Sequence, residues 1–283
     1  MKAEQHDLQR ILTLRDEFKR RGTHCVAVTV ARGGSVRLPR KNVQPFCGRP
    51  LVGWSVLQGR CSHLVTDNYV STDDEEIADI SRAAGAEIIW RYESAGKGST
   101  ANVPFSHAIR QIREHHPVDI ILSILPTGPV RQPWDYDESV ALYWLEKQKR
   151  GRINQLIPLA PKLETVVHRE VDDFRSQVIL GDKRGRFLDG AGSTWSVCDP
   201  DWYLRMAQEG PKTDAEIDEQ FVDYSNRVRD MANQPCLYYY RMEPWQCFDI
   251  DTLQDWGTQE ALMRQHILTT PDVYERYKAK ETP

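Results

Sequence analysis

Short apolar segments alternate with amphipathic segments through the first half of the chain, and this alternation constrains the fold more than any other feature. The apolar segments are typical of buried strands and lie at residues 24–30, 69–72, 86–90 and 118–125. Segments with helical spacing follow them, beginning at Pro50 and spanning Asp73–Arg82, Asn102–Glu114 and Asp135–Gln148. Strand alternating with helix in this way predicts an α/β fold, with a mostly parallel mixed sheet and helices on both faces.

The pattern is different at both ends of this alternation. Residues 3–21 have the spacing of an amphipathic helix, and from Gly151 onward the segments are less regular. We expect strands at 153–159, 192–197, 237–241 and 247–251, an exposed hairpin within 165–187, helical structure in 200–230 and a final helix at 253–267. The chain is therefore divided into an N-terminal helical extension (1–22), a main domain (23–160 and 190–270), an inserted hairpin or dimerisation arm (161–189) and a C-terminal tail (271–283).

Composition limits the classes of function. A net charge of -4 gives no overall attraction to nucleic acid or to an anionic membrane. No apolar run is long enough to span a bilayer and the first residues lack the apolar stretch of a signal peptide, so we expect a cytoplasmic protein. The six cysteines lack metal-ligand spacing, so neither a zinc site nor a disulfide framework is predicted.

The loop after the first strand is the first candidate site. It reads Ala31-Arg32-Gly33-Gly34-Ser35-Val36-Arg37-Leu38-Pro39-Arg40-Lys41-Asn42 and contains four basic residues. Two adjacent glycines let backbone N–H groups turn toward an anion, while the guanidinium and ammonium groups supply positive charge and donors. The loop therefore favours a polyphosphate site, although a Gly-Gly turn after a strand is more often an ordinary turn.

Two acidic stretches and one rigid turn are the other candidates. Asp249-Ile250-Asp251 would place two carboxylates on one side of an extended segment, where they could hold Mg²⁺. An N-cap at Asp251 for the last helix explains the pair equally well, and helix capping explains most of the cluster Asp73–Glu76. The turn 126–131 follows the fourth strand at the carboxyl edge of the sheet, where open α/β sheets bind ligands.

Taken together, these motifs resemble the acylneuraminate cytidylyltransferase family, the CMP-sialic acid synthetases and their relatives that act on other 3-deoxy-2-keto sugar acids. The matching motifs occur in the family's order from about residue 24 to residue 267. They are Ala31-Arg32-Gly33-Gly34-Ser35 with Lys41-Asn42, Val70-Ser71-Thr72-Asp73-Asp74-Glu75-Glu76-Ile77-Ala78, Arg91, Pro126-Thr127-Gly128-Pro129-Val130-Arg131, Gly192-Ser193-Thr194-Trp195 and Asp249-Ile250-Asp251.

The resemblance implies a Rossmann-like nucleotidyltransferase fold, CTP as a substrate, Mg²⁺ as the cofactor and a homodimer in which the inserted arm reaches the partner's active site. Carried over by position, the nucleotide would be bound by Ala31, Arg32, Gly33, Gly34, Ser35, Lys41, Asn42, Ser71 and Arg91. The acceptor would be bound by Leu125, Thr127, Arg131, Ser193 and Trp195, and the metal by Asp249 and Asp251. Arg32, Lys41 and Asp251 would act in catalysis.

The chain also departs from the family pattern, mostly on the acceptor side. Val36 stands where the family usually has a lysine, and whether Arg37 replaces that cation is left open. Leu125 replaces a glutamine, Trp195 replaces a tyrosine, and 96–100 replaces the usual Asp-Thr-Ala-Ser stretch. These changes indicate that the CTP end is kept while the acceptor pocket is altered.

The predicted function is transfer of CMP from CTP to the hydroxyl of a sialic-acid-like sugar acid, with release of pyrophosphate. The partners would be CTP and a small acidic acceptor, with no nucleic acid and no membrane. Two alternatives remain: CMP transfer to a non-sugar acid such as a phosphonate, and a nucleotide-binding protein that has lost transferase activity. The retained pair Asp249 and Asp251 argues against the second.

Overall fold

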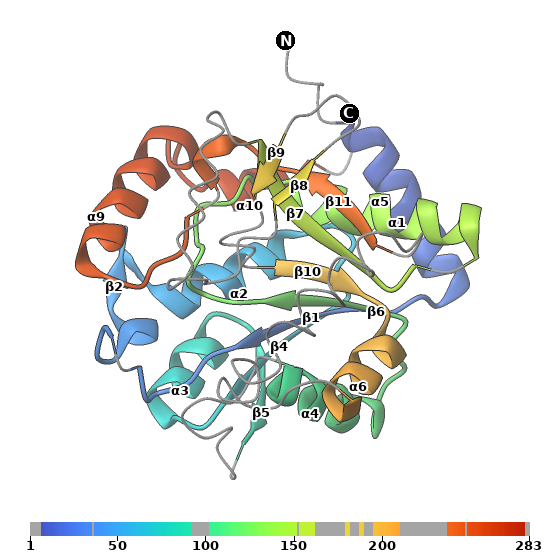
Figure 1. Ribbon diagram of the computed structural model, residues 1–283, viewed down its shortest axis with the longest axis horizontal. Helices are drawn as coiled ribbons and strands as arrows, with labels where there is room; N and C mark the ends of the chain where they lie inside the picture. Colours follow the sequence, from blue (N-terminus) through green and yellow to red (C-terminus); the bar gives the residue numbers. More distant parts are fainter. Residues whose placement is uncertain are drawn as a thin grey trace.

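One mixed sheet organises the molecule (Figure 1). The computed structural model describes residues 7–35, 37–91, 102–151, 153–161, 179–181, 187–189, 195–209, 237–246 and 248–280. The strands of the sheet are β1 (Cys25–Val30), β4 (Asp67–Thr72), β5 (Glu87–Trp90), β6 (Ile120–Ile124), β7 (Gln155–Pro161), β8 (Ile179–Gly181), β9 (Phe187–Asp189), β10 (Trp195–Cys198) and β11 (Leu237–Arg241). Their order is β5–β4–β1–β6–β10–β7–β9–β8, and β11 pairs with β7.

Most of the central strands run in one direction. β5, β4, β1 and β6 are parallel neighbours. β10 lies antiparallel between β6 and β7, so β7 and its parallel partner β11 run in the same direction as β6. The carboxyl ends of β1, β4 and β6 therefore meet at one edge of the sheet, and the loops that follow these strands gather there.

Helices cover both faces of the sheet. They are α1 (Leu8–Arg21), α2 (Leu51–Cys61), α3 (Glu75–Ala83), α4 (Asn102–Arg113), α5 (Asp135–Arg150), α6 (Pro200–Glu209), α9 (Leu253–Leu262) and α10 (Val273–Lys278). Successive side chains of a strand point to opposite faces. Accordingly, Cys25 and Ala27 of β1 join the apolar cluster of α1 and α5, while Val26 and Val28 join the cluster of α4 and α6.

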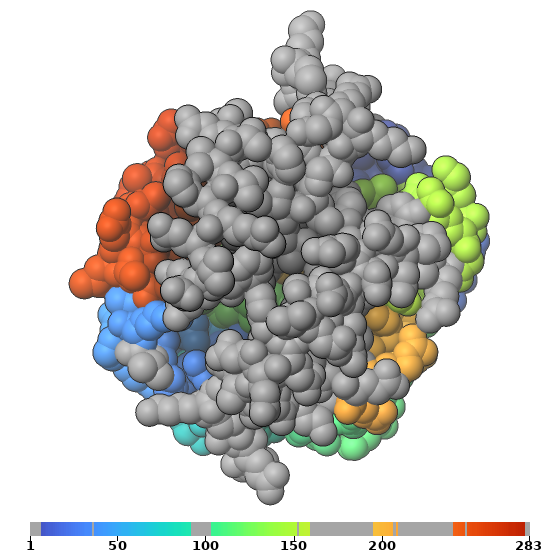
Figure 2. Space-filling model, in the orientation of Figure 1, coloured from blue at the N-terminus to red at the C-terminus, as the bar shows by residue number. Residues whose placement is uncertain are grey.

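The C-terminal part of the chain returns to the early loops. The early loops contain the 3₁₀ turn η1 (Lys41–Val43) and a hairpin of β2 (Pro45–Phe46) with β3 (Arg49–Pro50). The C-terminal part contains the 3₁₀ turn η2 (Pro244–Gln246) and the π-helical turn η3 (Met263–Ile267). The Cys47 amide donates to Glu260 Oε1 at 3.0 Å, and the ring of Phe46 meets that of Trp256 edge to face. Figure 2 shows the two regions adjoining at the left edge, the early chain in blue and α9 in orange-red.

The predicted alternation is confirmed, and the fold is α/β with a mostly parallel mixed sheet and helices on both faces. Strands 24–30, 69–72, 86–90 and 118–125 correspond to β1, β4, β5 and β6, and the four predicted helices to α2, α3, α4 and α5. The later strands at 153–159, 192–197 and 237–241 correspond to β7, β10 and β11, with boundaries shifted by a few residues.

The predicted strand at 247–251 is wrong. Residue 247 lies outside the described residues, and 248–251 form no ladder with another strand. The Ile250 amide instead donates a single backbone hydrogen bond, 2.8 Å long, to the Thr127 carbonyl. Ile250 is fully buried, so the apolar residue that favoured a strand anchors an extended loop.

The C-terminal region contains more helix than the sequence predicts. The final helix predicted at 253–267 changes from α9 to the π-helical turn η3 at Met263. Residues 271–283, interpreted as a tail, include α10, whose Tyr274 and Tyr277 are buried. These two tyrosines alternate with charged residues, so the short segment has too few apolar positions for helical periodicity to be recognised.

Some of the predicted segments of the chain include residues that the structure does not describe. The predicted extension contains α1, which packs on α5 within the main core. In the region of the predicted arm, β8 pairs antiparallel with β9, and β9 with β7, while 162–178 and 182–186 lie outside the described residues. Of the helical prediction for 200–230, α6 is described and 210–230 are not. In the described part of the chain, no helix combines the length and apolarity that crossing a membrane requires.

Candidate active site

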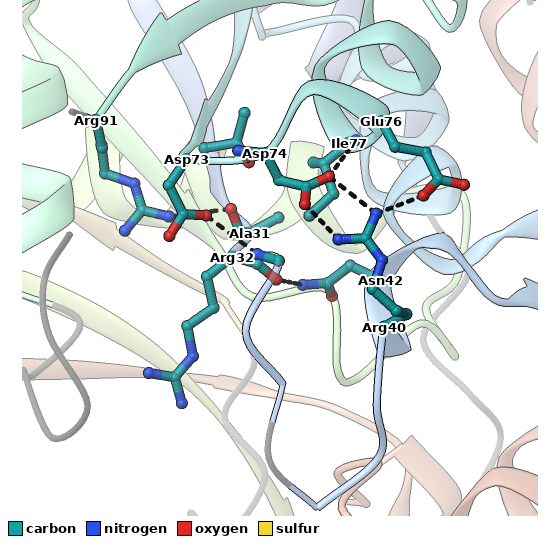
Figure 3. A network of polar contacts seen from close by, with 11 residues as sticks. Ala31, Arg32, Arg40, Asn42, Asp73, Asp74, Glu76, Ile77 and Arg91 are labelled. Carbon is teal, nitrogen blue, oxygen red and sulfur yellow. Dashed lines mark hydrogen bonds and ion pairs between the residues drawn. The ribbon is translucent and has the colours of Figure 1, made fainter.

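The loop after β1 is held by the acidic turn between β4 and α3 (Figure 3). The Gly33 amide donates to Asp73 Oδ1 at 3.0 Å, and the Ser35 amide donates to the Gly33 carbonyl at 3.0 Å. A Cβ at Gly33 would lie 2.3 Å from Asp74 Oδ2, so any larger residue there would collide with that carboxylate. Two of the amides that the sequence suggested for an anion therefore have partners within the protein.

Arg40 fastens the same loop to α3. Its guanidinium pairs with both oxygens of Asp74, one at 3.1 Å, and with Glu76. Asp74 is also the N-cap of α3, since its Oδ1 accepts the Ile77 amide at 3.0 Å. Pairing with Arg40 holds the pKa of Asp74 below its usual range. The predicted capping role of this cluster is confirmed for Asp74, and the structure adds Arg40 as its partner.

Lys41 and Arg37 converge on the carboxylate pair in the C-terminal part of the chain. Lys41 Nζ donates to the Ile250 carbonyl and lies 3.6 Å from Asp251 Oδ1. Arg37 pairs with Asp251 Oδ2. The Lys41 side chain is only 9% exposed, whereas those of Arg37 and Asp251 are 54% and 44% exposed. The structure thus brings together the predicted loop cation and the predicted metal ligand.

Arg32 differs from the other basic residues of the loop. Its carbonyl accepts the Asn42 side-chain amide at 3.0 Å, which fixes the backbone. In Figure 3 its side chain extends away from the network, and it forms no hydrogen bond or ion pair within the described part of the chain. Among the described residues, the Arg32 side chain therefore has hydrogen-bonding capacity left for a ligand.

Arg91 lies at the carboxyl ends of β4 and β5. It is buried, its guanidinium donates to the carbonyls of Ala31 at 3.0 Å and Ser71 at 3.3 Å, and burial lowers its pKa, an effect that nearby Asp73 opposes. Arg91 Nε and Ser71 Oγ are buried without a partner among the described residues. Two predicted nucleotide-binding residues thus retain unused polar atoms at this edge.

The carboxylate pair is built by a loop anchored in the core. Asp249 is mostly buried, and its Oδ1 has no partner among the described residues. Burial raises the pKa of Asp249, an effect that the Thr127 hydroxyl and Lys41 oppose. The N-cap of α9 is Thr252, whose side chain and that of Asp255 accept each other's backbone amides. The alternative role of Asp251 as N-cap is therefore wrong.

The donor set at this pair fits a magnesium ion. Mg²⁺ is usually held in proteins by one or two carboxylates and completes its shell with water and substrate phosphates. Asp249 and Asp251 supply two carboxylates, one with a buried oxygen that lacks a partner in the described structure. No group of three or more His, Cys, Asp or Glu side chains assembles among the described residues, so a purely protein-built metal cage is not formed there.

The residues predicted to bind the acceptor lie mainly in the interior. Arg131 is 1% exposed and donates to Gln58 Oε1 at 2.8 Å and the Leu125 carbonyl at 2.7 Å. Its guanidinium lies over the rings of Tyr136 and Trp195, and Trp195 donates to Ser139 Oγ. In this arrangement Arg131 and Trp195 support the turn after β6. Leu125 and Thr127 belong to that turn, and Ser193 lies outside the described residues.

Sequence reasoning did not anticipate the contacts of Asp73 and Arg37. Asp73 was interpreted as part of a helix cap, yet it accepts the Gly33 amide from the neighbouring strand's loop. The only signal that could have suggested this contact is the predicted parallel pairing of the two strands, whose carboxyl ends would then meet. Nothing in the sequence pairs Arg37 with Asp251, which lies 214 positions away.

Comparisons with known proteins agree with this arrangement. A family model described as cytidylyltransferase matches residues 26–186. N-acylneuraminate cytidylyltransferase A of Danio rerio is 29% identical over 248 residues, which are 86% of this chain and 51% of that protein. CMP-N,N'-diacetyllegionaminic acid synthase of Legionella pneumophila is 30% identical over 122 residues, which are 42% of this chain and 52% of that protein. The chain spans about half the length of the first of these relatives.

A solved structure is similar in fold. CMP:2-keto-3-deoxy-manno-octonic acid synthetase complexed with CTP superposes with a TM-score of 0.58 at 16% identity, covering 87% of this chain and all of that chain. At this level of identity the likeness concerns the fold alone.

Proposed function

Because the chain belongs to the cytidylyltransferase family, we propose that it transfers CMP from CTP to the hydroxyl of a 3-deoxy-2-keto sugar acid and releases pyrophosphate. The names of its relatives support an acidic sugar as acceptor, since they include enzymes named for neuraminate and for diacetyllegionaminic acid. In the reaction the acceptor oxygen bonds to the α-phosphorus of CTP, the bond from that phosphorus to the β-phosphate oxygen breaks, and the hydroxyl proton is released.

One observation carries this proposal. Lys41, from the loop after β1, donates to the carbonyl of Ile250, the residue between Asp249 and Asp251, and lies 3.6 Å from Asp251 Oδ1. The cationic loop therefore contacts the candidate metal site. Phosphoryl-type transfer depends mainly on alignment and on neutralising the charge that develops on the phosphates. Cations and paired carboxylates at one sheet edge are the groups that such a reaction needs.

We assign the nucleotide-binding roles to residues around this edge. Arg32 and Lys41 would contact the triphosphate, together with the backbone of Ala31, Gly33, Gly34 and Ser35. The Gly33 and Ser35 amides would first have to leave their partners in this structure, Asp73 and the Gly33 carbonyl. Asn42 would keep the loop in position through the Arg32 carbonyl, as it does in this structure. Ser71 and Arg91 would hold the nucleotide with the Ser71 Oγ and Arg91 Nε atoms, which are buried without a partner among the described residues.

Asp249 and Asp251 would hold Mg²⁺. When bound, the ion would neutralise part of the triphosphate charge and so favour departure of pyrophosphate. In this structure Lys41 is placed beside Asp251 and donates to the Ile250 carbonyl, so it keeps one positive charge next to the pair. Asp251 would therefore act both as a metal ligand and as a catalytic residue.

We propose that the acceptor pocket differs from a pocket that binds N-acetylneuraminate. Leu125 packs with the apolar cluster of α4 and α6 and offers no amide to a sugar hydroxyl. An acid with fewer hydroxyls or other substituents would suit this position, with Thr127, Arg131, Ser193 and Trp195 as the other acceptor residues. Residues 161–189 are proposed as the arm of a homodimer.

Incubation with CTP, Mg²⁺ and a panel of 3-deoxy-2-keto sugar acids and phosphonates tests the function. Release of pyrophosphate with one class of acid, and formation of the matching CMP ester, is the expected result. Release with phosphonates alone would replace the sugar-acid acceptor by the alternative acid. Measurable CTP binding without pyrophosphate release from any acid would contradict the transferase and favour a nucleotide-binding protein.

A further inference from the structure

Asp251 has two cationic neighbours of different kinds. Lys41 is nearly buried and also donates to the Ile250 carbonyl, so it is anchored to the backbone. Arg37 is more than half exposed, and the only partner recorded for its side chain among the described residues is Asp251. Arg37 can therefore move away from Asp251 more easily than Lys41 can.

Because both side chains are exposed to solvent, breaking the Arg37–Asp251 ion pair costs little free energy. Ion pairs between solvent-exposed side chains contribute about 0–1 kcal/mol, because water screens them and long side chains lose freedom when they pair. A ligand of higher charge at the same place can displace such a pair. The Lys41 contact lacks this property, since the Lys41 side chain is 9% exposed and its ammonium group has a second partner.

Charge at the pair is balanced while Arg37 is present. Arg37 and Lys41 contribute two positive charges, and Asp249 and Asp251 contribute at most two negative charges. These four side chains therefore offer a divalent cation no net negative charge, so the attraction that they exert on it is weak. The nearby Asp255 carboxylate adds one negative charge, but it accepts the backbone amides of Asp251 and Thr252. Removal of Arg37, or arrival of a polyanion, would change that balance.

We propose that Arg37 is an exchangeable cation of the active site, which neutralises Asp251 in the nucleotide-free protein and moves to the triphosphate when the nucleotide and metal bind. The proposal rests on the proposed function. Arg37 follows Val36, the position at which the family usually has a lysine. Its forked guanidinium suits phosphate oxygens. Metal would accordingly enter with the nucleotide, and Arg37 is a positioning and binding residue rather than a fixed ion-pair partner.

Two binding measurements on the full chain test the exchange. Mn²⁺, which shares oxygen ligands with Mg²⁺, is titrated into the nucleotide-free protein and followed by electron paramagnetic resonance. CTP is titrated in the presence of Mg²⁺ and followed by calorimetry. The variants are Arg37→Gln, which removes the charge, and Arg37→Lys, which retains it. Arg49→Gln is the matched control, because Arg49 is an exposed cation paired with Glu275.

Arg37→Gln is expected to bind Mn²⁺ about tenfold more tightly and CTP about tenfold more weakly than the wild type. Arg37→Lys should match the wild type in Mn²⁺ affinity, because it keeps the charge, and should bind CTP with an affinity between those of the wild type and Arg37→Gln, because it lacks the fork. Arg49→Gln should match the wild type in both measurements. Adding Asp251→Asn to Arg37→Gln should remove the gain in Mn²⁺ affinity, which would place the ion at Asp251.

Equal Mn²⁺ binding by Arg37→Gln and Arg49→Gln would overturn the competition for Asp251. Unchanged CTP affinity in Arg37→Gln would overturn the move to the triphosphate. If the wild-type protein binds no CTP, the proposed function fails and the triphosphate part fails with it. The Mn²⁺ titration still decides whether Arg37 competes with a cation.

Discussion

At the scale of single residues, the number of basic side chains in the loop after β1 does not equal the number available to a ligand. Arg40 is committed to Asp74 and Glu76, and Lys41 is anchored at Ile250. Arg37 pairs at the exposed surface, and Arg32 is without a partner in the described structure. Their four roles follow from which carboxylates and carbonyls the fold places within reach.

Asp251→Asn tests the carboxylate pair. The asparagine keeps the shape of the side chain but removes the charge that a metal and Lys41 require, so turnover should fall by roughly 100-fold or more. The fold should persist, because the backbone amide of residue 251 still reaches Asp255 and the N-cap is Thr252. Pyrophosphate release and thermal unfolding are the measurements, and unchanged turnover would show that the pair has no catalytic role.

Gly33→Ala tests the support of the loop by the β4–α3 turn. The new methyl group would lie 2.3 Å from Asp74 Oδ2, so either the loop or the carboxylate with its Arg40 partner must shift. We expect a loss of about 1–3 kcal/mol in the free energy of unfolding and weaker CTP binding. Urea denaturation and calorimetry measure the two effects.

Gly34→Ala is the matched control for that substitution. A Cβ at Gly34 meets no atom of the described residues within 4 Å, so this variant should retain its stability. Equal behaviour of the two alanine variants would mean that the close approach of Asp74 to Gly33 does not constrain the loop.

At the scale of elements, the start of α9 fixes the position of Asp251. Thr252 and Asp255 form a reciprocal capping pair, and Asp255 also accepts the Asp251 amide at 3.0 Å. These bonds hold Asp255 ionised, with its pKa below the usual range despite an opposing effect of burial. The helix cap therefore also orders the end of the loop that carries the carboxylate pair.

Thr252→Ala should destabilise the protein by about 1 kcal/mol, the usual cost of losing an N-cap side chain. It should also lower turnover, because Asp251 loses part of its support. Thr258→Ala is the control, since the exposed Thr258 hydroxyl only donates to the carbonyl one turn earlier in the same helix. Urea denaturation of both variants decides, and equal stability would contradict the importance of the cap.

At the scale of the whole molecule, a buried acidic centre joins the C-terminal part of the chain to α5. Asp135 accepts the Gln132 amide, the Gln246 side chain at 2.6 Å and the Tyr240 hydroxyl at 2.9 Å. Burial raises the pKa of Asp135 to about 7; its hydrogen bonds oppose this shift and nearby Glu138 adds to it. Stability of the whole chain should therefore depend on the protonation of this one carboxyl group.

Between about pH 4 and pH 7, the folded protein keeps a proton on Asp135 that the unfolded chain has released. The free energy of unfolding contributed by this group therefore falls as the pH rises through that window, by up to about 4 kcal/mol. Asp135→Asn removes the titration. Urea denaturation from pH 4 to 8 should give a wild-type curve that declines relative to that of the variant, and parallel curves would contradict the shifted pKa.

The strands and helices of the first half of the molecule could be predicted from local sequence alone. Their apolar periods of two and of three to four residues are local properties, so β1, β4, β5, β6 and the helices between them could be predicted. The resemblance of several motifs in one order also identified the family, and it led to the proposal of Asp249 and Asp251 as metal ligands.

Which charged groups contact one another depends on how the chain folds in three dimensions. The partners of Arg37, Arg40 and Gly33 lie 214, 34 and 40 positions away, and no local pattern encodes such contacts. The same reason explains why the strand predicted at 247–251 is wrong and why α10 was not predicted. The first is extended because Ile250 docks on the turn after β6. The second is helical because Tyr274 enters an apolar core built by distant segments and buried Tyr277 donates to Asp137. Local periodicity determines the helices and strands, whereas burial and charge pairing between distant segments determine the arrangement of the candidate active site.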